Sequence, residues 1–258
     1  FWYPATKQAY RTAKILNFDI TVFAPKGRGE AGTLEMVHFL KKVLEERYDG
    51  ICISPIADLR VEKLLQKMAE KGVEVIFILS AFDSVPYRTL IGTDSYQCGR
   101  STGEAVREAL GADGAVGIIK WKDNLIETVE DRYHGVVDVL KENRIPYYDM
   151  TGPGEPTAEE ATKLTDRLLT EHPDISVLCA TNVGWGLAFA RYLKSKGKKV
   201  KLVTVDFTDE VGEFMKAGYV DAAIAQRPES WGSMTLEKIE AVFEGQSIPK
   251  TIDTGTYP

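Results

Sequence analysis

The segment Ala115-Val-Gly-Ile-Ile-Lys-Trp121 decides the class of fold, because it is a nearly unbroken apolar run of strand length. Strands that are buried on both faces have this composition, whereas a strand with one face in water alternates apolar and polar residues. The segment therefore indicates a parallel sheet that is covered on both sides. Comparable runs recur along the chain, and the predicted strands are residues 18–24, 50–54, 73–79, 89–92, 115–121, 147–150, 176–180, 201–205 and 221–225.

Amphipathic helix patterns lie between these predicted strands. The apolar residues of 34–48 and 97–110 recur with a helical period, and Thr157-Ala-Glu-Glu160 has the form of a capping box that opens another helix. Strands that alternate with helices form βαβ units with right-handed crossovers. The alternation alone leaves two architectures open, namely two doubly wound α/β domains or one (β/α)8 barrel.

The composition is that of a globular protein, with 258 residues, of which 44% are hydrophobic and 27% are charged. Lys and Arg number 32 against 38 Asp and Glu, so that the net charge is −6. This balance argues against a nucleic-acid partner and against an anionic membrane surface. No apolar run reaches the roughly 18 residues that a membrane-spanning helix requires.

The residue types that support metal or covalent chemistry are scarce. The three cysteines are too few for a disulfide framework and form no CxxC pair, and the three histidines are far apart in the sequence. We therefore expect no metal site and no cofactor. A barrel hydrolase would place carboxylates at strand ends, as Asp94 and Asp206 are placed, but no Walker loop accompanies them. A binding protein is expected rather than an enzyme.

Polar motifs follow several predicted strands and recur in a recognisable order. They are Ile91-Gly-Thr-Asp-Ser-Tyr-Gln-Cys-Gly-Arg100, Asp131-Arg-Tyr-His-Gly135, Thr181-Asn182, Val205-Asp206 and Ala225-Gln-Arg-Pro228. In this order and at these spacings the chain resembles the type I periplasmic sugar-binding proteins, the ribose- and galactose-binding group. The effector domains of LacI-type repressors share that fold. The resemblance implies two doubly wound parallel-sheet α/β domains joined by a three-stranded hinge, with the ligand clamped between them.

The resemblance also implies where the domains begin and end. The N-terminal domain is expected to comprise residues 1–94 and 227–252, and the C-terminal domain residues 95–226 and 253–258. Asp94, Gln226 and Arg227 are then hinge residues, although Asp94 is equally suited to cap the helix that begins near Gln97. Since the chain opens on Phe1-Trp2-Tyr3-Pro4 in a helix that follows the family's first strand, we expect that strand, and a signal or lipoprotein peptide, to precede it.

Four residues of the C-terminal domain match ligand-binding positions of the family. Arg132 offers a fork of donors suited to vicinal hydroxyls, and its neighbours three and four positions away are not acidic, which weakens the alternative of a surface ion pair. Asn182 offers a donor and an acceptor, and can also cap the next helix. Asp206 matches a carboxylate that accepts two sugar hydroxyls, with helix capping as its alternative. Gln226 matches a ligand-binding glutamine, or bonds to the hinge backbone.

The N-terminal domain matches the family less closely. Phe1 and Trp2 correspond to an aromatic pair that stacks on the sugar ring, unless they are frayed or core residues. The ribose-type proteins carry an Asp-Arg pair after the strand at 73–79, whereas this chain has Ser80, with Asp83 further on as a substitute. The stacking aromatic of the second domain is also missing from its usual place, and Trp121 could supply it. The resemblance therefore favours another sugar or a polyol over ribose and galactose.

These expectations combine into one function and one alternative. The protein is expected to be a bacterial extracytoplasmic solute-binding protein, periplasmic or membrane-anchored, that presents its ligand to an ABC importer permease or to a sensor histidine kinase. We expect a monomer that closes about its hinge when the ligand binds. The alternative is the effector-binding domain of a LacI-type transcriptional regulator.

Overall fold

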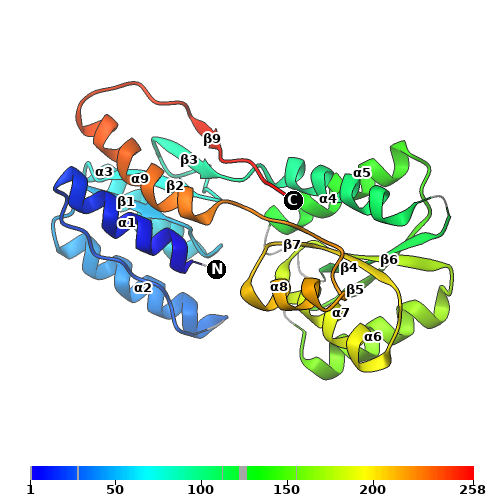
Figure 1. The fold of residues 1–258 in the computed structure, drawn as a ribbon. Coiled ribbons are helices and arrows are strands. Elements are labelled where there is room, and N and C mark those ends of the chain that lie inside the picture. Colours follow the sequence, from blue (N-terminus) through cyan, green and yellow to red (C-terminus); the bar gives the residue numbers. More distant parts are fainter. Residues whose placement is uncertain (1, 28, 112, 122–126, 155) are drawn as a thin grey trace. The chain divides into compact units, whose positions relative to one another are not determined.

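The computed structural model describes residues 2–27, 29–111, 113–121, 127–154 and 156–258. The chain divides into two compact units (Figure 1). The first unit comprises Phe1–Thr93 and Arg227–Thr254, and the second comprises Asp94–Gln226 and Gly255–Pro258. The chain therefore passes from one unit to the other at three places, after Thr93, after Gln226 and after Thr254.

The first unit is a parallel sheet with helices on both faces. Its strands follow the order β1-β2-β3-β9, with bounds Gly50–Ile53, Glu74–Ile78, Thr89–Gly92 and Thr251–Asp253. Along β2, Val75 and Phe77 pack in one core with α2 (Glu30–Glu45) and α3 (Leu59–Glu70). Ile76 lies in a second core with α1 (Tyr3–Leu16) and α9 (Pro228–Phe243). This alternation between two covered faces explains the continuous apolar run of the strand.

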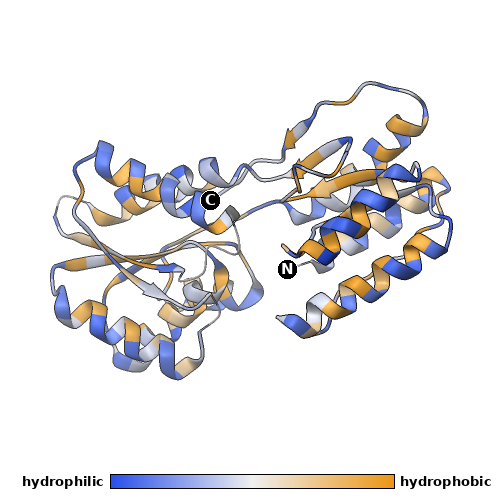
Figure 2. Cartoon of the chain, turned by 180° about the vertical axis from the view of Figure 1, so that it is seen from behind, coloured by the Kyte–Doolittle hydropathy of each residue, from blue (hydrophilic) through white to orange (hydrophobic). Residues whose placement is uncertain are grey.

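The second unit repeats this architecture with five parallel strands in the order β5-β4-β6-β7-β8. Their bounds, in chain order from β4, are Ala115–Trp121, Tyr147–Gly152, Ile175–Ala180, Lys201–Val205 and Ala222–Ile224. One face packs on α4 (Ser95–Leu110) and α5 (Glu127–Glu142). The other packs on α6 (Ala158–Glu171), α7 (Val183–Lys196) and α8 (Asp209–Lys216). Figure 2 shows that the helices around this sheet are amphipathic, with apolar and polar residues on different sides.

Two separate parallel sheets confirm the pair of doubly wound domains and exclude the (β/α)8 barrel. The strand predicted at residues 18–24 is wrong, because this segment has no regular secondary structure and pairs with no strand of the described chain. A strand needs a hydrogen-bonded neighbour, and no described strand precedes it. Side-chain packing holds the segment instead, since Phe23 stacks on Phe39 of α2 with ring centroids 4.2 Å apart.

Two glycines bring α4 and α5 of the second unit into close contact. A Cβ at Gly99 would lie 2.2 Å from the carbonyl oxygen of Arg132, and a Cβ at Gly135 would lie 2.3 Å from that of Tyr96. Both values are far below an ordinary van der Waals distance, so only glycine permits this approach. This contact sets how α5 lies against α4 and the sheet. It therefore also sets the position of Arg132, which belongs to α5.

Gly135→Ala is expected to lower the free energy of unfolding by about 1–3 kcal/mol, the range for an inserted methyl group that forces a backbone shift. Chemical denaturation followed by circular dichroism would measure the loss. Gly111→Ala is not a suitable control because φ is 75° there. Gly184→Ala is better, since its new Cβ would meet only the Asn182 side chain, at 3.0 Å. Equal stability of Gly135→Ala and the parent protein would contradict the close helix contact.

Candidate functional site

The carboxyl-terminal edge of the second unit's sheet gathers most of the residues that the sequence singled out. From β4 the chain goes to β5 on one side and then to β6 on the other, so that the strand order reverses between β4 and β6. Ligands of open α/β sheets bind outside the strand ends at such a reversal. The residues at or just after these strand ends are Trp121 on β4, Asn182 after β6, Asp206 after β7 and Gln226 after β8.

Arg132 lies on α5 and is 5% exposed. Its Nη1 donates to the carbonyl oxygen of Thr181, directly after β6, at 3.4 Å. Its Nε is buried and has no hydrogen-bond partner. A buried guanidinium that reaches a strand end and leaves one donor unused is not the solvated helix arginine considered as the alternative. The structure therefore brings Arg132 to the same edge as Asn182.

Asp206 is held in an unusual backbone conformation, with φ at 71°. The carboxylate is 6% exposed, and its Oδ1 accepts a 2.7 Å hydrogen bond from Nε2 of Gln226. Burial raises the pKa of Asp206, while the positive charge of Arg132 and the bond from Gln226 act in the opposite direction. Helix capping is not its role, because Thr208 caps α8. Arg132, Asp206 and Gln226 are all buried; Gln226 bonds to Asp206, and Arg132 acts on Asp206 through its charge. We call these three residues the Arg132–Asp206–Gln226 group.

Asn182 performs the capping role that the sequence suggested and leaves its amide nitrogen available. Its Oδ1 accepts from the backbone N–H of Trp185 at 3.0 Å, which fixes the first turn of α7. Its Nδ2 is buried and has no partner. Asp94 likewise caps α4, because its Oδ1 accepts from the N–H of Gln97 at 2.9 Å. The two expected roles of Asn182 are thus compatible.

Unpaired buried atoms concentrate at this edge. Among the described residues, eight buried side-chain N or O atoms have no hydrogen-bond partner, and four of them belong to the residues already named. An unsatisfied buried polar group costs about 1–3 kcal/mol. Folding alone does not account for such a concentration, which makes this edge the candidate ligand site. The four atoms are three donors and one acceptor: Trp121 Nε1, Arg132 Nε, Asn182 Nδ2 and Gln226 Oε1.

The predicted site residues of the first unit do not gather into one buried group. Phe1 lies outside the described residues. Trp2 is 39% exposed, and its ring lies 5.5 Å from that of Trp231, a core residue. Ser80 is half-buried after β2, whereas Asp83 is exposed. The described residues among them form no buried hydrogen-bonded group comparable to the Arg132–Asp206–Gln226 group of the second unit.

Sequence reasoning missed one residue of the first unit, Leu79. It directly follows β2 and has φ at 66°, a conformation that is strained for a leucine. A Cβ on Gly92 of the neighbouring strand would approach its backbone at 3.0 Å, so the two positions are closely packed. Leu79 and Asp206 share this left-handed conformation immediately after a parallel strand. Nothing in the residue type could have indicated it.

Two glycine-containing segments have the form of catalytic motifs but not their structural context. Gly99-Arg-Ser-Thr-Gly103 has the form GxSxG, yet it lies inside α4 and not on a strand-to-helix turn. Residues 27–32 have the form GxGxxG and extend into the first turn of α2. Here the N–H groups of Lys26 and Gly27 donate to the carboxylate of Glu35, at 2.7 and 3.1 Å. An internal carboxylate therefore takes amide donors that a phosphate would need.

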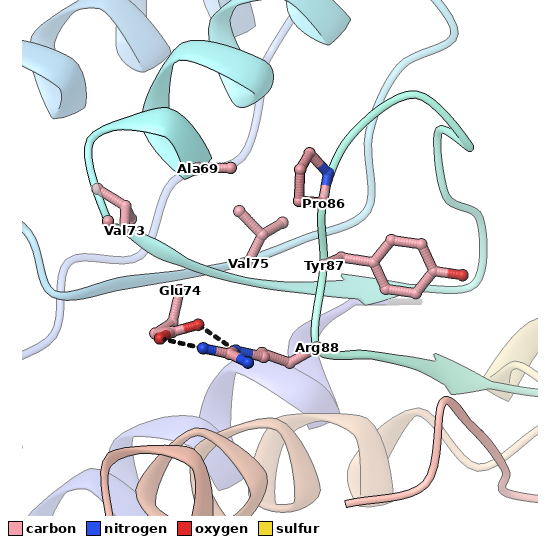
Figure 3. A pocket seen from close by; sticks show the side chains of 8 residues that line it. Ala69, Val73, Glu74, Val75, Pro86, Tyr87 and Arg88 are labelled. Atoms are coloured by element: carbon pink, nitrogen blue, oxygen red, sulfur yellow. Dashed lines mark hydrogen bonds and ion pairs between the residues drawn. The ribbon is translucent and has the colours of Figure 1, made fainter. Parts of the chain in front are cut away.

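A cavity of about 280 Å³ lies at the amino-terminal edge of the first unit's sheet (Figure 3). It is lined by Val73 and Glu74 at the start of β2 and by Pro86, Tyr87 and Arg88 ahead of β3. Arg88 Nη2 donates to Glu74 Oε1 at 2.8 Å, so the two charged side chains of the cavity already form an ion pair with each other. The cavity contains none of the predicted site residues and is not the candidate site.

The described part of the chain lacks two further features. None of its helices is both long and apolar enough to cross a bilayer. Nor does this part contain a group of three or more His, Cys, Asp or Glu side chains that could hold a metal ion.

Comparison with known proteins agrees with this geometry. Residues 1–247 match the model of the periplasmic binding protein domain family. The ribose import binding protein of Bacillus subtilis is 21% identical over 83% of this chain and 69% of its own length, and that of Haemophilus influenzae is 25% identical over 78% and 68%.

Solved structures show the same fold. A glucose-galactose binding protein from Geobacillus stearothermophilus superposes with a TM-score of 0.86 at 20% identity, covering 99% of this chain and 91% of its own. A solute binding protein from Agrobacterium vitis bound with α-D-tagatopyranose gives 0.85 at 23% identity, covering 99% and 88%. With a family model that spans nearly the whole sequence, the chain belongs to the periplasmic binding protein family.

Proposed function

We propose that the protein binds a sugar or a sugar-like polyol at the carboxyl-terminal edge of the second unit. The observation that carries this proposal is the set of four unpaired buried atoms around the Arg132–Asp206–Gln226 group. Sugar hydroxyls both donate and accept, so one small molecule can satisfy the three donors and the acceptor together. Family membership places the protein outside the cytoplasm, and binding rather than catalysis is its function.

Each residue has a distinct role in this proposal. Arg132 donates to neighbouring hydroxyls through its planar fork, and Asp206 accepts from two hydroxyls while Gln226 holds it in place. Asn182 donates from Nδ2, and Trp121 donates from Nε1 or offers its ring to a C–H face of the sugar. Trp2, Ser80 and Asp83 are proposed as further contacts from the first unit, together with Phe1.

The names of the relatives support delivery of the ligand to an ABC importer. The Bacillus subtilis protein is a ribose import binding protein, and other structural neighbours are ABC transporter solute binding proteins, among them one in complex with D-arabinose. We propose a membrane permease as the partner, with a sensor histidine kinase as the alternative. We further propose a bacterial monomer that is either periplasmic or extracellular and anchored to the membrane. A LacI-type effector domain has no comparable support among these relatives.

Thermal unfolding in the presence of single solutes tests the proposal. A ligand that binds only the folded protein at 100 times its Kd stabilises it by about 2.7 kcal/mol. We expect a rise in Tm with a pentose, a hexose or a polyol, and none with amino acids. Trp121→Phe is expected to weaken the effect, whereas Trp185→Phe does not remove a free donor, because Trp185 Nε1 already donates to the carbonyl of Pro153 at 2.9 Å. A shift with amino acids and none with sugars would overturn the assignment.

A further inference from the structure

Lysines gather at the amino-terminal edge of the second unit's sheet. The segment Lys194-Ser-Lys-Gly-Lys-Lys-Val-Lys201 runs from the last turn of α7 into β7 and contains five lysines. Lys216, the last residue of α8, adds a sixth. A cavity of about 420 Å³ opens among Gly197–Lys201 and the turn that follows α8. We call these six residues the lysine cluster.

The charge of the lysine cluster is not neutralised within the protein. In the described part of the chain none of the six forms an ion pair. Lys194 and Lys198 lie over the rings of Phe214 and Tyr192, at 5.8 and 6.0 Å, and Lys201 donates to the carbonyl oxygen of Ala109 at 2.6 Å. The nearby carboxylate of Asp221 accepts the N–H of Leu202 at 2.8 Å. The remaining lysines extend into solvent.

Helix electrostatics explain only part of the lysine cluster. Cations are favoured in the last turn of a helix, which accounts for Lys194, Lys196 and Lys216. Lys198 and Lys199 follow the end of α7 and gain little from its dipole, and Lys201 already belongs to β7. The helix dipoles therefore do not account for Lys198, Lys199 and Lys201, and none of these three is paired with a carboxylate in the described part of the chain.

We propose that the lysine cluster binds the anionic phospholipid headgroups of a bilayer. All six cations are lysines, which act as flexible point charges, whereas recognition of a single phosphate or carboxylate favours the rigid fork of arginine. Basic clusters of this size attract anionic membranes through the sum of weak contacts. The overall charge of −6 does not prevent this, because charges beyond about 8 Å are largely screened at physiological salt.

The position of the lysine cluster fits a resting contact with the membrane. It lies at the amino-terminal ends of the strands, whereas Arg132 and Asp206 lie at or near the carboxyl-terminal ends of the same sheet. A protein held by the cluster keeps the proposed sugar site of this unit directed away from the lipid. Since the attraction is screened by salt, it is also reversible.

Co-sedimentation with vesicles tests this inference. The intact chain is expected to bind vesicles of phosphatidylcholine mixed with phosphatidylglycerol, to release them as salt is raised, and not to bind phosphatidylcholine alone. The variant Lys196→Gln/Lys198→Gln/Lys199→Gln is expected to lose at least about tenfold in binding, since several lysines contribute jointly. The matched control Lys63→Gln/Lys67→Gln/Lys71→Gln removes three exposed lysines at α3 and is expected to bind as the parent does.

Several outcomes would overturn the inference. They are equal binding to both kinds of vesicle, an equal loss in the two triple variants, and no binding to either vesicle, which would assign the cluster to a protein partner. The sugar-induced rise in Tm is expected to be the same in both triple variants and in the parent. A failure of the sugar assay therefore leaves the vesicle result readable, and the reverse also holds.

Discussion

Asp206→Asn is expected to abolish measurable sugar binding while the unliganded protein remains folded. A hydrogen bond to a charged group contributes about 1.5–3 kcal/mol, so the loss of two such bonds lowers affinity by about 10²–10⁴-fold. Asparagine keeps an oxygen that can accept from Gln226, and it tolerates the left-handed backbone at φ 71°. Isothermal titration calorimetry with the ligand found in the Tm screen would measure the affinity.

The pH dependence provides an independent check on Asp206. Burial raises its pKa in the folded protein above the value in the unfolded chain. Its contribution to stability is therefore fully present below the unfolded pKa and is lost as pH rises through the folded pKa. Above the folded pKa the ionised carboxylate destabilises the empty site, and a ligand offsets this by donating to it. We expect Asp206→Asn to raise the Tm of the unliganded protein at neutral pH. If the Tm of the variant depended on pH as the Tm of the parent does, the assignment would be contradicted.

Arg132→Lys is expected to weaken sugar binding by about ten- to a hundredfold, which corresponds to one or two charge-assisted hydrogen bonds. Lysine preserves the charge beside Asp206 but not the fork that reaches both the Thr181 carbonyl and a hydroxyl. Arg132→Ala is expected to lose stability as well, because it leaves a buried carboxylate without its cation. Calorimetry and thermal unfolding on the same samples separate the two effects.

Arg100→Lys is the matched control for this substitution. Arg100 lies on α4, which packs against α5, but its guanidinium is exposed and pairs with Glu142 at 2.8 Å. Exposed pairs contribute little, so we expect no change in affinity. If Arg100→Lys weakened binding as much as Arg132→Lys, the effect would lie in the packing of the helix pair and not in the site.

Prediction from the sequence succeeded where a pattern of residues is compatible with one kind of structure. Continuous apolar runs such as 115–121 could only be strands covered on both faces, and the polar residues that follow them could only lie at one edge of a parallel sheet. It failed at residues 18–24, where the pattern is that of a strand but the described chain offers no neighbour to pair with.

The geometry of the site was less predictable than its composition. The type and place of Arg132 and Asp206 were readable, but the left-handed backbone of Asp206 and Leu79 is a property of tertiary structure. The role of Gly99 and Gly135 in setting the α4–α5 distance was likewise unreadable from one sequence, because a glycine inside a helix is otherwise only unfavourable.

The interrupted course of the first unit has a consequence for its biosynthesis. Its strands β1 to β3 are made first, but α9, which supplies Trp231, Leu236 and Ile239 to the core over Ile76 and Ile91, follows the whole of residues 94–226. During translation the second unit can therefore complete its sheet while one face of the first is covered by α1 but not yet by α9. An apolar sheet face that waits for its helix is a site for chaperone binding or aggregation. The nascent chain is thus vulnerable until α9 has been synthesised.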